Sequence, residues 1–167
     1  GALIQLRRAL KPDGLLLAAL FGGETLRELR QALVTAESEV SGGARPRISP
    51  LADIRDAGSL LQRAGFALPV ADTDVLTVSY ENPLKLMLDL RGMGEQMATH
   101  NRQKTFTRRS ILFRAAEIYQ DMFGDADGRV PATFEVITLT AWAPAPNQQQ
   151  PSRRGSGDVN LEDVFKP

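Results

Sequence analysis

The sequence predicts an α/β fold in which a small sheet is flanked by helices. Residues 14–21 are a continuous apolar run, and residues 75–80 and 134–142 alternate between apolar and polar side chains, as strands do. Between them lie segments with apolar residues at helical spacing. With 167 residues, 43% of them hydrophobic and 24% charged, the chain has the composition of one globular domain.

The first two elements are a short helix and a strand. Leu3, Leu6 and Leu10 fall on one face of a helix over residues 2–10, and residues 11–14 have the composition of a turn. The run Gly14–Phe21 is apolar on both faces, which is typical of a central strand with helices on either side.

Two helices are predicted next. Residues 24–40 carry apolar side chains at helical spacing, with Glu24 near the positive N-terminal end. Ser49-Pro50 has the pattern of an N-cap and first helical residue, so a second helix is expected from there to Ala64, ended by Gly65.

The remaining elements alternate between strand and helix. Residues 75–80 are expected to be a strand, and Asn82-Pro83 is expected to open a helix that Gly92 and Gly94 interrupt. An apolar stripe predicts a further helix over 107–123, and residues 134–142 form the last predicted strand. Residues 144–167 are expected to be a mobile tail after a domain at 1–143, because 144–157 contains almost no apolar side chain.

Charge and composition exclude several classes of function. Lys plus Arg and Asp plus Glu both number 20, so nothing in the overall balance favours nucleic acid or an anionic membrane. The absence of cysteine excludes disulfides, thiolate metal sites and a cysteine nucleophile. The longest apolar run is about eight residues, against the roughly 20 of a membrane-spanning helix. Residues 125–128 hint at a calcium loop, but Val136 stands where a bidentate glutamate is needed, so no metal site is predicted.

Several segments, taken together, resemble class I S-adenosylmethionine-dependent methyltransferases. A helix, then Leu10-Lys-Pro-Asp-Gly14, then a strand that ends in Phe21-Gly22-Gly23 is similar to the passage into the fifth strand of that fold. The order of further segments resembles one branch, which contains a methyltransferase-like complex I assembly factor associated with arginine hydroxylation and the biotin-pathway malonyl-[acyl-carrier protein] O-methyltransferase. These segments are 22–29, 48–50, 61–66, 72–74, 89–95 and 130–133.

This resemblance implies a partial Rossmann-like fold, with strands five, six and seven of a seven-stranded sheet and the seventh antiparallel between the other two. Residues 83–124 would be a helical insertion over the substrate side. The glycine-rich loop and the acidic residue that bind the cofactor are expected upstream of Gly1, so S-adenosylmethionine binding is expected of the intact parent only. Phe21 and Gly22 are the cofactor-binding candidates within this chain.

The substrate-binding candidates each have a structural alternative. Arg47 stands where biotin-pathway relatives carry an arginine, and it could grip a carboxylate or be a solvated loop residue. Tyr80 could point its hydroxyl at a substrate or pack on the insertion. The glycine-containing break in the helix that begins at Pro83 consists of Arg91, Gly92 and Met93, and it could approach a ligand or only turn the chain. The polar residues Asn101 and Arg102, beside His100, could overhang the site.

Three functional hypotheses follow from the resemblance. The parent protein would methylate a protein-bound or carrier-bound group, hydroxylate an arginine, or serve without catalysis as a partner-binding module in complex I assembly. The edge of the strand Gly14–Phe21 that a fourth strand would cover predicts a possible homodimer. The expected compartment is the bacterial cytoplasm, or the mitochondrial matrix in a eukaryote.

Overall fold

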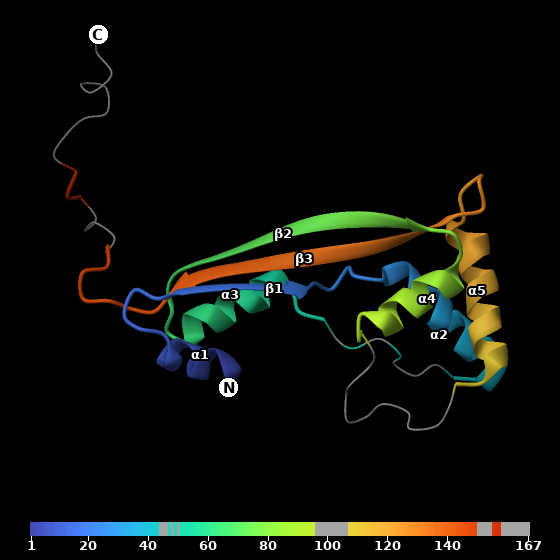
Figure 1. The fold of residues 1–167 in the computed structure, drawn as a ribbon, viewed down its shortest axis with the longest axis horizontal. Helices are drawn as coiled ribbons and strands as arrows, with labels where there is room; N and C mark the ends of the chain where they lie inside the picture. Colours follow the sequence, from blue (N-terminus) through green and yellow to red (C-terminus); the bar gives the residue numbers. More distant parts are fainter. Residues whose placement is uncertain (44–46, 48, 50, 96–106, 150–154, 158–167) are drawn as a thin grey trace, which may run out of the picture.

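A computed structural model describes residues 1–43, 47, 49, 51–95, 107–149 and 155–157 (Figure 1). It contains three strands and five helices within those residues, which confirms the α/β class. The candidates Asn101 and Arg102 and most of the predicted tail lie outside the described residues.

The sheet has the order β1-β3-β2, and β3 is antiparallel to both neighbours. The resemblance predicted this central antiparallel strand, and the prediction is confirmed. The strands are β1 (Leu15–Phe21), β2 (Ala67–Tyr80) and β3 (Val130–Trp142).

Both long strands begin earlier than the alternation predicted. β2 was expected at 75–80 and β3 at 134–142. Prolines interrupt the strand pattern in the earlier parts, because Pro69 lies in the irregular pairing between Ala67 and Val70 and Pro131 is the second residue of β3. Proline is tolerated at edges and irregularities of a sheet, where its missing N–H is not needed.

The helices follow the predicted order with one correction. The predicted start at Ser49-Pro50 is wrong: α3 begins at Ile54, and Asp53 is its N-cap, whose carboxylate accepts hydrogen bonds from the N–H groups of Arg55 and Asp56. The Asp53 carboxylate thus satisfies two of the free N–H groups of the first turn, which fixes the start of α3. The helices are α1 (Ala2–Ala9), α2 (Arg27–Ser41), α3 (Ile54–Arg63), α4 (Pro83–Gly92) and α5 (Arg109–Phe123).

The helices α4 and α2 differ in how well their starts were predicted. Asn82 caps α4 by accepting from the Lys85 N–H at 3.0 Å, as predicted. The helix α2 starts three residues later than predicted, because residues 22–26 form a turn in which Leu26 is left-handed, with φ 56°. Glu28 rather than Glu24 therefore occupies its first turn.

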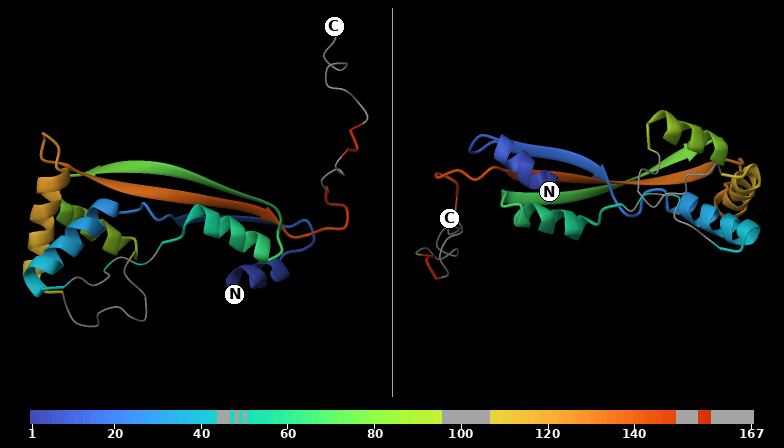
Figure 2. Two further views of the ribbon diagram at one scale, coloured as in Figure 1. Left: turned by 180° about the vertical axis from the view of Figure 1, so that it is seen from behind. Right: turned by 90° about the horizontal axis from the view of Figure 1, so that it is seen from below.

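Two apolar cores divide the molecule along the sheet. One lies at the N-terminal part of β3, where α2, α4 and α5 pack together, and the other lies where α3 and α1 cover the C-terminal part of β3. Figures 1 and 2 show the same division, with α1 and α3 on one face of the strands and the other three helices gathered at the far end.

Where α1 and α3 cover one face of the sheet, the opposite face is exposed within the described residues. Leu17 of β1 and Val70 of β2 are 66% and 55% exposed, whereas neighbouring Leu16, Ala18 and Ala71 face the second core. The prediction that β1 is covered on both sides is therefore wrong for the described residues, because β1 is an edge strand with helices on one face only. In the described part of the chain, no helix is long and apolar enough to cross a membrane.

Candidate functional site

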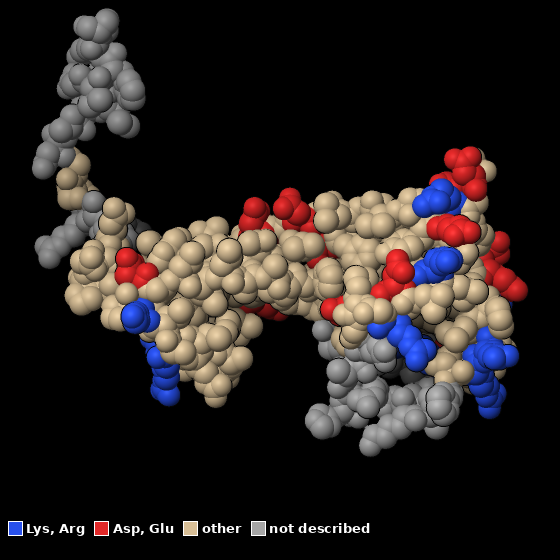
Figure 3. All heavy atoms as spheres, in the orientation of Figure 1, with Lys and Arg blue, Asp and Glu red and all other residues tan. Residues whose placement is uncertain are grey.

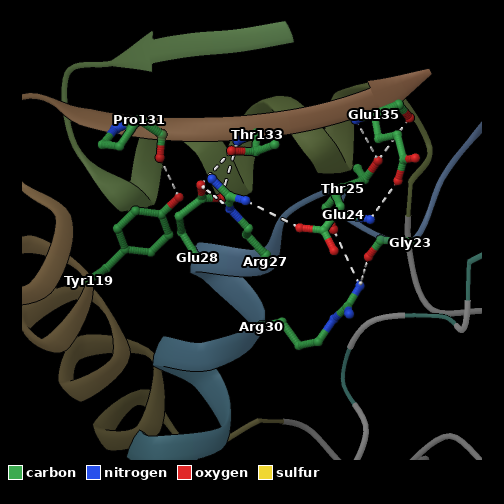
Figure 4. Close-up of polar contacts among 10 residues, drawn as sticks. All are labelled: Gly23, Glu24, Thr25, Arg27, Glu28, Arg30, Tyr119, Pro131, Thr133 and Glu135. Atoms are coloured by element: carbon green, nitrogen blue, oxygen red, sulfur yellow. Dashed lines mark hydrogen bonds and ion pairs between the residues drawn. The ribbon is translucent and has the colours of Figure 1, made fainter. Parts of the chain in front are cut away.

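The turn that follows β1 is fastened to β3 by hydrogen bonds (Figure 4). The Thr25 hydroxyl accepts from the Glu135 N–H at 3.0 Å and donates to the Glu135 carbonyl at 3.1 Å. The Leu26 N–H donates to the Thr133 carbonyl at 2.7 Å. Thr25 is 2% exposed, so these bonds form where water cannot replace them.

Glu28 continues the same arrangement one helical turn later. Its buried carboxylate accepts from the Thr133 N–H at 3.2 Å and from the Thr133 hydroxyl, and Arg27 donates to it at 3.3 Å. Burial acts to raise the pKa of Glu28, but these hydrogen bonds, with one from its own backbone, outweigh burial and hold the pKa below its usual value. Glu28 is therefore held as a carboxylate.

These contacts take the place of a neighbouring strand. Glu135, Thr133 and Pro131 direct their backbone groups to the side of β3 on which β1 lies, but β1 ends at Phe21, opposite Val136. Beyond that point the Tyr119 hydroxyl donates to the Pro131 carbonyl at 2.7 Å. Because proline has no N–H, Tyr119 completes the hydrogen bonding of this edge of the strand.

Gly22 is explained by a contact with Glu135. A Cβ atom at Gly22 would lie 2.5 Å from the Glu135 carboxyl carbon and from one carboxyl oxygen. That carboxylate accepts from the Glu24 N–H at 2.8 Å and from the Thr73 hydroxyl at 3.2 Å. The glycine therefore leaves room for a side chain of this protein, whether or not a ligand also approaches it.

Two adjoining pockets lie at the carboxyl end of β1. The smaller, about 120 Å³, is bounded by α2, by the end of α4, by β3 and by the described residues Arg47, Ser49 and Leu51. The larger, about 650 Å³, lies against β1 and opens to solvent. Both are mainly apolar, and they share Phe21, Leu51 and Glu95. Phe21, a predicted cofactor contact, lines both pockets, and its role toward a ligand stays a prediction.

Arg47 lines the smaller pocket and is also held by protein groups. It donates to the Glu37 carboxylate at 2.6 Å and to the Thr107 hydroxyl at 2.7 Å. The side chains of Arg47 and Glu37 are 15% and 4% exposed. Arg47 therefore links the segment before α3 to α2 and to the start of α5, and its predicted role toward an anionic substrate remains a prediction.

The other predicted substrate contacts do not converge on these pockets. Tyr80 packs against the first core, and burial, together with the charge of Asp89, raises the pKa of its hydroxyl. Arg91, Gly92 and Met93 are exposed at the end of α4, and neither pocket is lined by them.

Sequence reasoning missed Glu95 and Leu51, and it missed the pairing of Glu28 with Thr133. A signal for that pairing was present, since residues 22–29 and 130–133 were both among the segments that carried the resemblance. In the structure these two segments contact each other. Among the described residues, no group of three or more His, Cys, Asp or Glu side chains could hold a metal ion.

Comparison with known proteins identifies the family. No family model matches the chain. It is 45% identical to an arginine-hydroxylase, NDUFAF5, mitochondrial, of Danio rerio over 99% of its length, and 42% identical to that of Homo sapiens over 99%. It is 41% identical to a malonyl-[acyl-carrier protein] O-methyltransferase of Xylella fastidiosa over 83% of its length. The chain belongs to this branch of the methyltransferase fold.

The chain spans about half the length of these relatives: 51% and 48% of the two arginine-hydroxylases and 44% of the methyltransferase. A crystal structure of a putative methyltransferase from Bacillus halodurans aligns with a TM-score of 0.44 and 16% identity, over 86% of this chain and 62% of that one. The assignment to the branch rests on the curated relatives.

Proposed function

We propose that this chain is the substrate-facing part of an S-adenosylmethionine-dependent methyltransferase that acts on a protein-bound or carrier-bound group. The observation that carries the proposal is the pair of pockets at the carboxyl end of β1. In α/β sheets with open edges, ligands bind beyond the carboxyl ends of the strands. The relatives named as methyltransferases support the reaction type.

The described residues do not fit the whole cofactor. S-adenosylmethionine carries an amino-acid carboxylate, a ribose and a sulfonium, and its carboxylate needs a cation or a cluster of N–H donors. The larger pocket is lined by apolar side chains and by the carboxylate of Glu95, and no Lys or Arg is among the described residues that line it. We therefore assign the main cofactor contacts to another part of the parent, and only an apolar wall at Phe21 to this chain.

The part of the reaction left to this chain is positioning. Methyl transfer requires little beyond holding the acceptor atom in line with the reactive carbon of the cofactor. The apolar pocket walls would hold the body of the acceptor and exclude water. Arg47 would contact the acceptor only if its guanidinium bound the ligand and the Glu37 carboxylate at the same time.

Arginine hydroxylation is the second candidate. The relatives with that name are up to 45% identical over 99% of the chain, against 41% over 83% for the methyltransferase of Xylella fastidiosa. These relatives are also named as mitochondrial, which supports the mitochondrial matrix as the proposed compartment in a eukaryote. In a bacterium the proposed compartment is the cytoplasm.

Calorimetric titration with S-adenosylmethionine and S-adenosylhomocysteine tests the proposal. The chain and the full-length parent should be titrated in parallel, and binding by the parent alone is expected. The mass of a candidate acceptor then separates the two chemistries, because one adds a methyl group and the other an oxygen atom. A parent that binds neither ligand would overturn the methyltransferase proposal and favour a partner-binding module without catalysis.

We also propose that the isolated chain forms a homodimer through the β1 edge. β1 pairs only with β3 in the described sheet, and Leu15 and Leu17 beside its free edge are 50% and 66% exposed. In this register Ala19 directs its N–H outward, away from β3. Ala19→Pro should therefore leave the sheet intact and abolish the dimer in light scattering, whereas a wild-type monomer at high concentration would contradict the proposal.

A further inference from the structure

The outer edge of β2 is a second open edge, at the opposite side of the sheet. Ala132, Phe134 and Val136 of β3 direct their backbone groups toward β2, since the alternate residues bond on the β1 side. Their partners on β2 are Val78, Leu76 and Asp74, so the residues between these direct their N–H and C=O groups outward. The outward residues are Thr73, Val75, Thr77 and Ser79.

Protein groups close this edge at both ends and leave its middle open. The Thr73 N–H donates to the Asp72 carboxylate at 2.9 Å, and Arg129 donates to the Ser79 carbonyl at 2.7 Å and to its hydroxyl at 2.8 Å. Within the described part of the chain, no group pairs with the outward N–H and C=O of Val75 and Thr77. The open stretch is long enough for a short extended peptide.

The side chains along this stretch combine apolar surface with two acidic groups. Leu76 and Val78 are 55% and 41% exposed, and Asp72 and Asp74 stand on the same face of the strand. In Figure 3, acidic side chains at the middle of the upper surface have no Lys or Arg beside them, whereas those at the upper right adjoin basic side chains. No Lys or Arg in the described part of the chain forms an ion pair with either aspartate.

We propose that the outer edge of β2 binds an extended segment of a partner protein that carries basic residues at alternate positions. Val75 and Thr77 would pair with the segment's backbone. Its two basic side chains would lie opposite Asp72 and Asp74, and apolar side chains would lie opposite Leu76 and Val78. The proposal gives a role to the segment Asp72–Asp74, which the enzymatic proposal leaves unused, and it is independent of that proposal.

Charge favours a basic partner over a second copy of this chain in the register centred on Val75. An antiparallel pair of β2 strands centred on Val75 would put Asp74 of one copy diagonally across from Asp74 of the other, and like charges so placed repel. A basic segment gains two ion pairs instead. Exposed acidic residues on an edge strand thus disfavour self-pairing and favour an oppositely charged strand.

The test uses the synthetic peptide Val-Thr-Leu-Thr-Lys-Thr-Lys, blocked at both ends, and fluorescence anisotropy at low salt. In antiparallel register its lysines lie opposite Asp74 and Asp72. The same peptide with glutamate in place of both lysines should bind at least tenfold more weakly. Methylation of the backbone nitrogens that face the protein should abolish binding, and methylation of the alternate nitrogens should not.

Two protein variants locate the site. D72N/D74N should weaken binding about threefold to tenfold, as expected for two exposed ion pairs, and high salt should have the same effect. Val75→Pro removes one outward N–H without removing a bond to β3, and it should prevent binding while the circular dichroism of the chain is unchanged. D121N, a change on the exposed face of α5, is the matched control.

Three outcomes would overturn the proposal: no binding of the lysine peptide, equal binding of the lysine and glutamate peptides, or equal binding by D72N/D74N and the wild type. Sedimentation of the chain alone tests whether a second copy of the chain binds this edge instead. A dimer that D72N/D74N strengthens and Val75→Pro abolishes would assign the edge to a second copy and also overturn the proposal.

Discussion

Glu28 and Thr133, which are 105 residues apart in the sequence, are joined by two hydrogen bonds in the interior of the protein. The first fastens α2 to the backbone of β3, and the second engages the threonine hydroxyl. This contact closes the strand edge beyond the end of β1 and thereby fixes the turn that frames the pockets.

The first prediction concerns acid stability. Because hydrogen bonds lower the pKa of Glu28 in the folded state, its contribution to stability is present above the unfolded value of about 4.3 and is lost as the pH falls through the folded pKa. Glu28→Gln should reduce the free energy of unfolding at pH 7 by about 1–3 kcal/mol. It should also make stability less dependent on pH below about 4.3. Urea unfolding at a series of pH values measures both effects.

The matched control is Glu81→Gln, at an exposed position after β2. It should leave the free energy of unfolding unchanged within about 0.5 kcal/mol. An equal loss in Glu81→Gln and Glu28→Gln would show that the contact with Thr133 contributes nothing specific.

The second prediction concerns the alkaline limit. Burial, and then the charges of Glu28 and Tyr80, raise the pKa of Tyr119 well above its usual value. Its contribution to stability is therefore present below the unfolded pKa of about 10 and is lost as the pH rises through the folded pKa. Tyr119→Phe should cost about 1 kcal/mol at pH 7, through loss of the bond to Pro131, and should lessen the alkaline decline. A variant with an unchanged alkaline profile would show that another group controls that limit.

The third prediction compares a buried ion pair with an exposed one. Arg47→Met leaves the Glu37 carboxylate buried without that partner and should cost about 3–5 kcal/mol. Arg114→Met removes a pair with Glu39 whose side chains are 40% and 44% exposed, and it should cost about 1 kcal/mol or less. Thermal and urea unfolding compare the two variants. Similar losses would mean that Arg47 is not a structural anchor, and its predicted role as a substrate contact would gain support.

Local patterns in the sequence predicted the order of elements and most of their types. The apolar run at 14–21 and the Asn82-Pro83 start were readable because each depends on neighbours in sequence. The starts of β2 and β3 were not, because Pro69 and Pro131 are acceptable only through the sheet geometry around them. The antiparallel place of β3 came from the family resemblance and not from the alternation of residues.

The site was less predictable than the fold, because its residues meet only after folding. Leu51 and Glu95 have no local signature and meet at the pockets from segments on either side of β2. Arg47 was singled out for its charge and for its match to an arginine of the biotin-pathway relatives, but Glu37, its partner at 2.6 Å, has in sequence only the pattern of a polar residue of an amphipathic helix. Charge pattern alone could not show that this arginine is paired inside the protein.

The last prediction separates two reasons for the glycine at position 22. Gly22→Ala would place a Cβ atom 2.5 Å from the Glu135 carboxyl group, so that side chain must turn away and lose its bonds to Glu24 and Thr73. We expect a loss of about 1–2 kcal/mol. Added to Glu135→Ala, the same change should cost nothing further, because the clash is gone and alanine loses less backbone entropy on folding than glycine.

A double-mutant cycle by urea unfolding measures this coupling, and additive losses would contradict it. The full-length parent supplies the functional comparison. If Gly22 serves only Glu135, the double variant should bind S-adenosylmethionine as the single variant Glu135→Ala does. If the backbone at Gly22 also approaches the cofactor, the double variant should be as stable as Glu135→Ala but should bind cofactor more weakly, because the new methyl group would occupy the space the ligand needs.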